Sequence, residues 1–210
     1  MPESEGVNGT KTAQIYPEVQ LIMARGKGSE ILKWSLIGSG IAVGAALIPM
    51  IPAIKRRAMR VTTILTKDHR LVSGLITTLE MTPRINGMIR KTLFEQIRTN
   101  VMVHAQAEEE VLYPAMRNIM FTGGESKVDE AYREHQQMKD LLNDLETMDP
   151  NTDAFDHKFE DFKRAFQHHV DEEENEMFVM VKERLSTERQ EELGERIHDR
   201  KMSLKTKMAA

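Results

Sequence analysis

The sequence contains no cysteine among its 210 residues. This absence excludes disulfides, thiolate metal sites, iron–sulfur ligation and cysteine redox chemistry, so any metal must be held by nitrogen and oxygen. Glycine and proline are sparse after residue 55, and the alternating β-branched pattern of strands is absent there. Residues that favour helices, chiefly Ala, Leu, Glu, Lys, Arg, Gln and Met, dominate this region. The sequence therefore predicts an all-α fold.

Charge of one sign is also lacking, since 29 Lys and Arg stand against 33 Asp and Glu. With a net charge of -4 and no dominant basic block, we expect no nucleic-acid partner. The fifteen methionines are interpreted as flexible side chains that fill gaps in a core.

A long run without charge lies before the helical region. Residues 34–54 are 21 residues without a charged side chain, bounded by Lys33 and Lys55. A helix of this length spans ~30 Å, which is about one bilayer core. Trp34 stands where an interfacial aromatic would lie. We therefore expect a single-pass membrane segment, with a buried hairpin or core helix as the alternative.

Two further features of this run bear on how it would be used. Gly40 and Gly44 form a GxxxG pair, which would allow a homo-oligomer through close helix contact, whereas Pro49 and Pro52 make the span imperfect. Basic residues are slightly more numerous after the run than before it, so the positive-inside rule places the following domain on the cytoplasmic side of the membrane.

From residue 58 onwards the pattern is one of long helices. Turn and breaker residues at Thr82-Pro83, Gly123-Gly124 and Asp149-Pro150 separate them, and Asn151 or Thr152 is a plausible N-cap. The predicted helices are 58–81, 84–116, 126–148 and 152–184, followed by a polar helix over 187–205. The predicted organisation is an irregular segment over 1–30, a transmembrane or membrane-associated segment over 31–55, a four-helix bundle over 56–184 and a C-terminal polar helix and tail over 185–210.

Each long helix carries an apolar stripe at the three- and four-residue spacing of a bundle core. The stripes are Leu65, His69, Val72, Ile76, Leu79; then Leu93, Ile97, Val101, His104, Glu108, Leu112; then Val128, Ala131, His135, Met138, Leu142, Leu145; and Phe155, Phe159, Phe162, Phe166, His169, Glu173, Met177, Met180. Every stripe contains one histidine, and two contain a glutamate one turn later. Three other histidines, His157, His168 and His198, fall off the stripes and are expected at the surface.

An ionised carboxylate in a core seam is costly without a partner, and a metal supplies the compensating charge. Alternating helix directions and a rise of 1.5 Å per residue place the four histidines at similar heights, ~15–22 Å from one end of the bundle. The predicted metal ligands are His69, His104, Glu108, His135, His169 and Glu173. The opposing interpretation is that these are structural core residues of a metal-free bundle.

An internal repeat supports the metal interpretation. The surroundings of His69 recur around His135 at an offset of 66 residues, and the segment from His104 recurs from His169 at an offset of 65. The domain therefore consists of two helical hairpins, each supplying His and then His-x-x-x-Glu. Such a bundle offers two metal positions that carboxylates could bridge, and the donor set suits iron or manganese, with zinc also open.

These residues resemble the hemerythrin-like, or HHE cation-binding, family over roughly residues 60–182. The matching signature is His69, then His104 to Glu108 with Leu112-Tyr113-Pro114 behind it, then His135, then His169 to Glu173 with Met177-Phe178. The resemblance implies an up-and-down four-helix bundle with an oxo- or hydroxo-bridged non-haem centre of two iron ions. It assigns the six residues as ligands, with Glu108 and Glu173 as bridging carboxylates.

The sequence departs from oxygen-carrying hemerythrins at two positions. Lys139 stands where they have a further histidine, and Glu173 stands where they have an aspartate. One iron would then have fewer protein ligands, and Tyr132, one turn before His135, could approach the site. We expect a carrier or sensor of oxygen, peroxide or nitric oxide near a membrane. The alternatives are a di-iron enzyme that consumes peroxide or oxidises iron, and a metal-free membrane-tethered interaction bundle.

Overall fold

The computed structural model describes residues 57–119 and 124–208 of the chain. The regular elements within these ranges are all helices, which confirms the predicted all-α class. They are α4 (Val61–Met81), η1 (Arg84–Asn86), α5 (Gly87–Ala107), η2 (Glu108–Leu112), α6 (Tyr113–Ile119), α7 (Gly124–Glu146), α8 (Asp153–Glu172), η3 (Glu173–Met177), α9 (Phe178–Arg184) and α10 (Thr187–Met208). Here η1 is a 3₁₀ turn, whereas η2 and η3 are π-helical.

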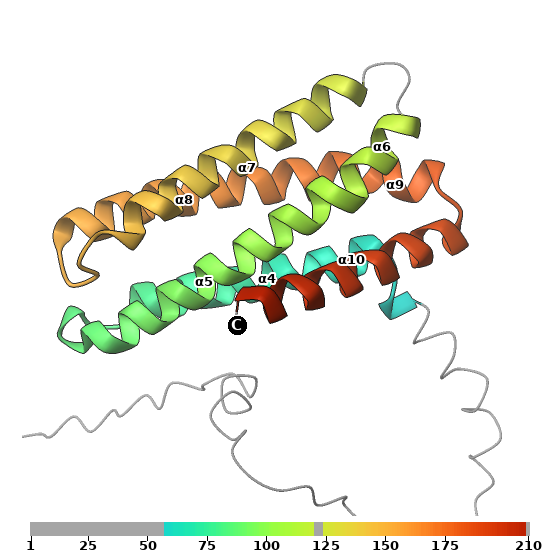
Figure 1. The fold of residues 1–210 in the computed structure, drawn as a ribbon. Helices are drawn as coiled ribbons and strands as arrows, with labels where there is room; N and C mark the ends of the chain where they lie inside the picture. The colour runs from blue at the N-terminus through green and yellow to red at the C-terminus, as the bar shows by residue number, and fades with distance from the viewer. Residues whose placement is uncertain (1–56, 120–123, 209–210) are drawn as a thin grey trace, which may run out of the picture. The chain divides into compact units, whose positions relative to one another are not determined.

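The helices form a bundle of two antiparallel hairpins (Figure 1). The first hairpin pairs α4 with the rod made of α5, η2 and α6, and the second pairs α7 with the rod made of α8, η3 and α9. The last helix, α10, lies along the outside of α4 and α5. The chain thus runs up and down the bundle, so each hairpin contributes one helix of each direction.

The helix ends follow from local chemistry. Helix α4 ends at Met81, directly before Thr82-Pro83, because the residue before a proline avoids the α region. Thr152 is the N-cap of α8, where its side-chain oxygen accepts a hydrogen bond from the Phe155 backbone N–H at 3.2 Å. Of the two N-caps that the sequence suggested, the structure selects Thr152.

The buried side chains form two apolar clusters with a polar layer between them. One cluster gathers around Leu65, Leu112 and Met116 towards α6, α9 and α10. The other gathers around Val72 and Phe162 towards the turns that join α4 to α5 and α7 to α8. The predicted histidine layer therefore lies in the middle of the bundle, closed off from water at both ends.

The predicted stripes are buried with two exceptions. Leu93 and Met180 are only partly buried, and Phe94 and Val181 take their places in the core. For Met180 the reason is η3, because a π-helical turn holds one residue more than an α-helical turn and rotates the following residues around the axis. The sequence interpretation assumed an unbroken α-helix there, and that assumption was wrong.

Helix α10 packs tightly against the beginning of the bundle. A Cβ atom built on Gly194 would lie 1.7 Å from the carbonyl oxygen of Met59, so only glycine allows this approach. Ile197 and Leu193 of α10 are fully buried on the same side. The polar C-terminal helix is therefore an integral cover of the first hairpin.

The expected membrane segment over residues 31–55 lies outside the described residues and stays a prediction, as do the predicted domain boundaries. Within the part of the chain that the structure describes, no helix combines the length and the apolar character needed to cross a bilayer.

Candidate metal centre

The six predicted ligands converge in the polar layer of the bundle. They come from four helical rods, and none of them is more than 3% exposed. Two overlapping groups have their donor atoms within 4.8 Å of one another. These groups are His69, His104, His169 and Glu173, and Glu108, His135 and His169. The structure thus brings all six residues together, while their binding of a metal stays a prediction.

The four histidines form two pairs, one from each hairpin. The Nε2 atoms of His69 and His104 lie 3.2 Å apart, and those of His135 and His169 lie 3.3 Å apart. Each pair directs two Nε2 atoms to a common point, which is the arrangement that two imidazole ligands of one ion require.

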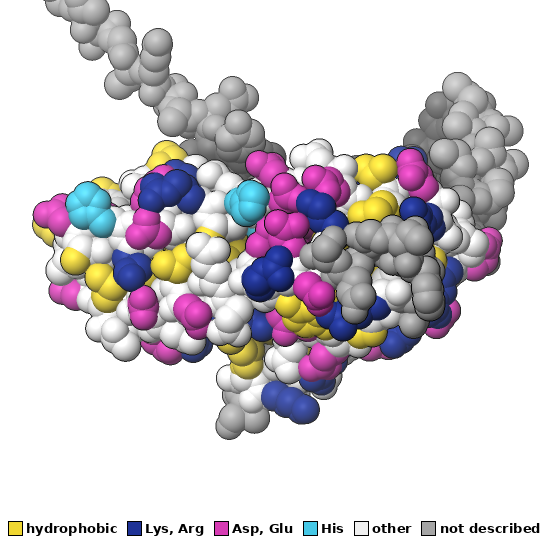
Figure 2. Space-filling model, turned by 90° about the horizontal axis from the view of Figure 1, so that it is seen from above, with side chains coloured by type: hydrophobic (Ala, Val, Ile, Leu, Met, Phe, Trp, Pro, Cys, Tyr) yellow, Lys and Arg dark blue, Asp and Glu magenta, His cyan; other side chains and the backbone are white. Residues whose placement is uncertain are grey.

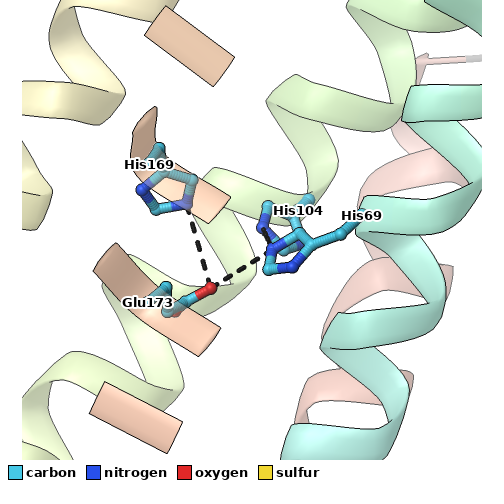
Figure 3. Close-up of side chains that lie close together, drawn as sticks. All are labelled: His69, His104, His169 and Glu173. Carbon is cyan, nitrogen blue, oxygen red and sulfur yellow. Dashed lines mark hydrogen bonds and ion pairs between the residues drawn. The ribbon is translucent and has the colours of Figure 1, made fainter. Parts of the chain in front are cut away.

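The two glutamates lie between the pairs. Glu108 Oε2 is 3.2 Å from His104 Nε2 and 3.3 Å from His135 Nε2. Glu173 Oε2 is 3.2 Å from His69 Nε2 and 3.9 Å from His169 Nε2, and Figure 3 shows it pointing between these rings. Each carboxylate therefore reaches one histidine of each hairpin, as a bridging ligand would.

A second set of carboxylates holds the outer nitrogens of the rings. The Nδ1 partners are Asp68 for His104 at 3.5 Å, Glu134 for His169 at 3.0 Å, Glu109 for His135 at 3.0 Å and Glu174 for His69 at 2.7 Å. An Nδ1–H that donates to a carboxylate leaves the Nε2 lone pair free and directed inwards. All four histidines are thus oriented as metal-binding histidines are.

Two of these carboxylates are themselves held by lysines. Lys139 Nζ lies 2.6 Å from Glu109 Oε1, and Lys201 of α10 pairs with both oxygens of Asp68. Lys139 occupies the position where oxygen-carrying hemerythrins have a further histidine, and here it holds Glu109, the Nδ1 partner of His135.

The π-helical turns η2 and η3 begin at Glu108 and Glu173. Such turns are frequent at functional sites, because they widen the helix and redirect side chains. Glu108 and Glu173 share this local geometry because the segments that contain them are copies in the internal repeat. Sequence reasoning did not predict these turns.

Burial and charge set the protonation of the layer. Burial lowers the pKa of His104 to about 4 and that of His135 well below its usual value, so both rings are neutral and able to bind a cation. Burial, reinforced by the nearby Glu173, raises the pKa of Glu108 well above its usual range. Burial alone would also raise the pKa of Glu173, but the close approach of His69 at 3.2 Å and attraction to His169 outweigh it and lower that pKa to about 2.

The two glutamates test whether a metal fits this site. Both carboxylate oxygens of Glu108 and both of Glu173 are buried without a hydrogen-bond partner, although imidazole nitrogens approach them. Buried oxygens of this kind are costly, and two carboxylates that face each other cannot both ionise without a positive charge nearby. Divalent or trivalent cations between the histidine pairs would satisfy all four oxygens, so the residues fit a metal centre.

Tyr113 is a residue of this layer that the search for ligands missed. Its buried hydroxyl lies 3.0 Å from His135 Nε2, and burial raises the pKa of the phenol well above its usual value, so it stays protonated. Tyr132, which the sequence placed near the site, donates instead to the carbonyl oxygen of Glu109 at 3.0 Å and packs edge-on against Tyr113.

The repeat held the signal for most of what was missed. Asp68 and Glu134 each precede a histidine of the layer, and Glu109 and Glu174 each follow one of its glutamates, at the same offsets of 66 and 65 residues as the repeat. The three histidines predicted at the surface, His157, His168 and His198, are exposed. One of them, His168, contacts Glu134 at 3.4 Å and so links solvent to the partner of His169.

Comparison with known proteins gives related matches. The Nostoc sp. protein named DNA nickase is 29% identical over 161 residues, which cover 76% of this chain and 44% of that protein. An uncharacterized hemerythrin-like protein of Schizosaccharomyces pombe is 24% identical over 129 residues, which cover 61% of this chain and 63% of that protein. The chain therefore spans less than two thirds of the curated relatives it matches.

The fold has a solved counterpart as well. The crystal structure of a Hemerythrin HHE cation binding domain-containing protein from Mycobacterium kansasii matches with a TM-score of 0.62 and 24% identity, covering 70% of this chain and 88% of that one. The family profile described as Hemerythrin HHE cation binding domain matches residues 60–181. This range contains all six residues of the buried layer, and the chain belongs to the hemerythrin HHE cation-binding domain family.

Proposed function

We propose that this chain is a non-haem di-iron protein that binds a small ligand such as oxygen, peroxide or nitric oxide, as a carrier or sensor. One observation carries the proposal: two histidine pairs share two buried carboxylates whose four oxygens have no hydrogen-bond partner. Within this proposal His69 and His104 bind one ion, His135 and His169 bind the other, and Glu108 and Glu173 bridge them.

The donor set supports iron. Imidazole nitrogens and carboxylate oxygens without sulfur suit iron, with manganese and zinc as less favoured alternatives. Iron would supply reversible redox chemistry and affinity for oxygen-like ligands. The protein residues orient the imidazoles through their Nδ1 bonds and exclude bulk water from the layer.

Burial supports a ligand of only a few atoms. The six side chains are at most 3% exposed, and the apolar clusters close the layer at both ends. A larger substrate would have to open the bundle. The Tyr113 hydroxyl near His135 offers a hydrogen bond to whatever binds at the second histidine pair.

That hydroxyl also supports a second candidate, an enzyme that consumes peroxide, because a neutral phenol can donate a proton to a leaving oxygen. Turnover of hydrogen peroxide by the iron-loaded protein, lost in Glu108→Ala, would favour this enzyme. Turnover no faster than that of free iron would leave the carrier or sensor.

Membrane location and DNA cleavage do not follow from the buried layer. The proposed place of the domain, on the cytoplasmic side of a membrane, depends on residues 31–55 and on the sequence alone. DNA cleavage, which the name of the Nostoc relative reports, is not extended to this chain, because the match covers only 44% of that relative.

The test is metal content with an absorption spectrum on aerobically purified wild type, His104→Ala and His157→Ala. We expect about two iron ions per chain and charge-transfer bands of a bridged centre in wild type, as the paired donor set requires. Both should be lost in His104→Ala and kept in His157→Ala, because His157 is exposed and distant from the layer. Iron-free wild type, or iron content unaffected by His104→Ala, would show that the histidines are structural.

A further inference from the structure

A basic groove lies at the N-terminal end of α4, outside the metal layer. Its volume is about 440 Å³. The cations that line it are Arg57, Arg60, Lys67, Arg70 and Lys182. Three threonines of the first turns of α4 and the amide side chain of Gln190 complete the lining, and no acidic residue takes part. The groove therefore offers hydrogen-bond donors and positive charge without any internal neutralisation.

None of these five cations forms an ion pair within residues 57–119 and 124–208. Elsewhere most lysines and arginines are paired, for example Arg90 with Asp156 and Lys163 with Glu80. Figure 2 shows a face on which basic side chains lie interspersed with acidic ones. In the groove, moreover, the Nε atom of Arg60 is buried without a hydrogen-bond partner.

Such a concentration of like charge is unfavourable unless an anion offsets it. Guanidinium and ammonium groups bind phosphate oxygens strongly, and threonine hydroxyls add neutral donors. The chemistry of the lining thus selects a phosphate-bearing ligand.

The place of the groove in the chain favours one source of phosphate. The groove is built where the chain enters the bundle, directly after the uncharged run of residues 34–54 and the basic residues that follow it. Basic residues on the cytoplasmic side of a membrane segment attract anionic lipids. Nucleic acid presents phosphates along an extended path, whereas this groove is compact and the net charge of the chain is -4.

We propose that this groove binds the headgroup phosphates of anionic lipids and holds the bundle against a membrane surface. The proposal depends on the expected membrane location and not on the metal, so the two can fail independently. Four of the five cations come from residues 57–70, the basic stretch that follows the uncharged run, and folding adds Lys182 of α9 to them.

The test is vesicle flotation of the full chain, comparing neutral phosphatidylcholine vesicles with vesicles that also contain phosphatidylserine. Wild type is compared with Arg70→Gln/Lys182→Gln, whose sites lie in the groove but outside the basic run at 55–57. The matched control is Lys91→Gln/Arg133→Gln, which removes the same charge from exposed positions elsewhere. A membrane segment would contribute equally to both vesicle types, so the ratio of the two partition coefficients reports the groove.

We expect the preference of wild type for phosphatidylserine vesicles to fall about 25-fold in the groove variant, since each of the two basic residues near an anionic surface contributes about fivefold. The control should change it much less, and high salt should abolish the difference. The circular dichroism spectrum and the melting temperature should be unchanged in both variants, which shows that they fold.

Three outcomes would overturn the proposal. One is a wild type without preference for phosphatidylserine, and another is a control variant that loses as much as the groove variant. The third is that inorganic phosphate or an oligonucleotide, at concentrations that saturate the groove, displaces the protein from the vesicles. This displacement would have to depend on Arg70 and Lys182 as vesicle binding does. That result would assign the groove to a soluble anion or to nucleic acid.

Discussion

The two hairpins of the bundle carry the same ligand pattern on different supports. Each supplies two histidines, one fully buried glutamate and two carboxylates that contact Nδ1 atoms, so the inner layer has near two-fold symmetry. The symmetry ends at the aromatic residue behind each glutamate. Tyr113 places a hydroxyl 3.0 Å from His135 Nε2, whereas its counterpart Phe178 only stacks on His69 with ring centroids 6.0 Å apart.

The outer supports differ as well. Asp68, which contacts His104 of the first hairpin, is held by Lys201 of α10. Glu109, which contacts His135 of the second hairpin, is held by Lys139 of α7. One histidine pair is therefore tied to the C-terminal helix, and the other has a hydroxyl at its edge. The repeat keeps the same histidines and glutamates in both hairpins, while the residues around them differ. Two chemically unequal positions can arise in this way, and such inequality suits a centre that binds a small molecule at only one of them.

The largest expected effect comes from removing a carboxylate that contacts histidines of both hairpins. Glu108→Ala and Glu173→Ala should each reduce iron from about two ions per chain to less than one, because each carboxylate reaches both histidine pairs. Metal analysis of the purified variants measures this. If either variant kept full iron content, that glutamate would not be a bridge, and the symmetry of the layer would be only structural.

Removal of the metal should have the next largest effect. The metal-free layer leaves two buried carboxylates facing each other, and binding to the folded state alone contributes several kcal/mol at saturating metal. We expect the chelator-treated protein to melt on the order of 5–10 °C below the iron form. In Glu108→Ala the chelator should change the melting temperature little, and equal melting of the two wild-type forms would contradict the ligand assignment.

These predictions depend on residues that sequence reasoning found, and it is clear why. His69, His104, His135 and His169 stand on apolar stripes whose spacing alone fixes which side of a helix faces the core. Proline and threonine at the helix ends indicated the lengths of the helices, and these lengths placed the four histidines at a common height in the bundle. Four histidines at one height in one core leave few arrangements, so the fold and the convergence of these side chains were predictable together.

What was missed depends on distances between helices. Glu174 reaches His69 across the bundle, and Lys201 reaches Asp68 from a helix that follows 133 positions later. No spacing rule within one helix reports such contacts. The π-helical turns were missed for another reason, since no residue type marks them, and they displaced Met180 from the core in favour of Val181.

The hairpins differ in the aromatic residue that follows each glutamate, and substitution can exchange Tyr113 and Phe178. Tyr113→Phe should keep iron content but shift the absorption bands, because the hydroxyl next to His135 is lost. In the metal-free protein, where His135 Nε2 can accept this hydrogen bond, the variant should lower the melting temperature by about 2–4 °C, as expected for one lost hydrogen bond of about 1 kcal/mol. Phe178→Tyr is the reciprocal variant, which adds a hydroxyl beside His69 and should perturb the spectrum differently. Unchanged bands in Tyr113→Phe would show that the hydroxyl does not influence the centre.

The smallest expected effect concerns the lysines that hold the outer carboxylates. Loss of a direct partner of a metal-binding histidine typically lowers metal affinity 10–100-fold. Because Lys201 and Lys139 contact such partners and not the histidines, Lys201→Met and Lys139→Met should each lower metal affinity about three- to tenfold. Competition with a chelator measures this, and Lys163→Met is the control, because its ion pair with Glu80 lies at the surface away from the layer.

The two variants should also be distinguishable, since Lys201 acts on His104 and Lys139 on His135 beside Tyr113. Lys139→Met should therefore alter the same bands as Tyr113→Phe, and Lys201→Met should leave them in place. If Lys201→Met matched Lys163→Met in affinity, α10 would cover the first hairpin without supporting its metal position. The chemical difference between the two histidine pairs would then depend on Tyr113 and Lys139 alone.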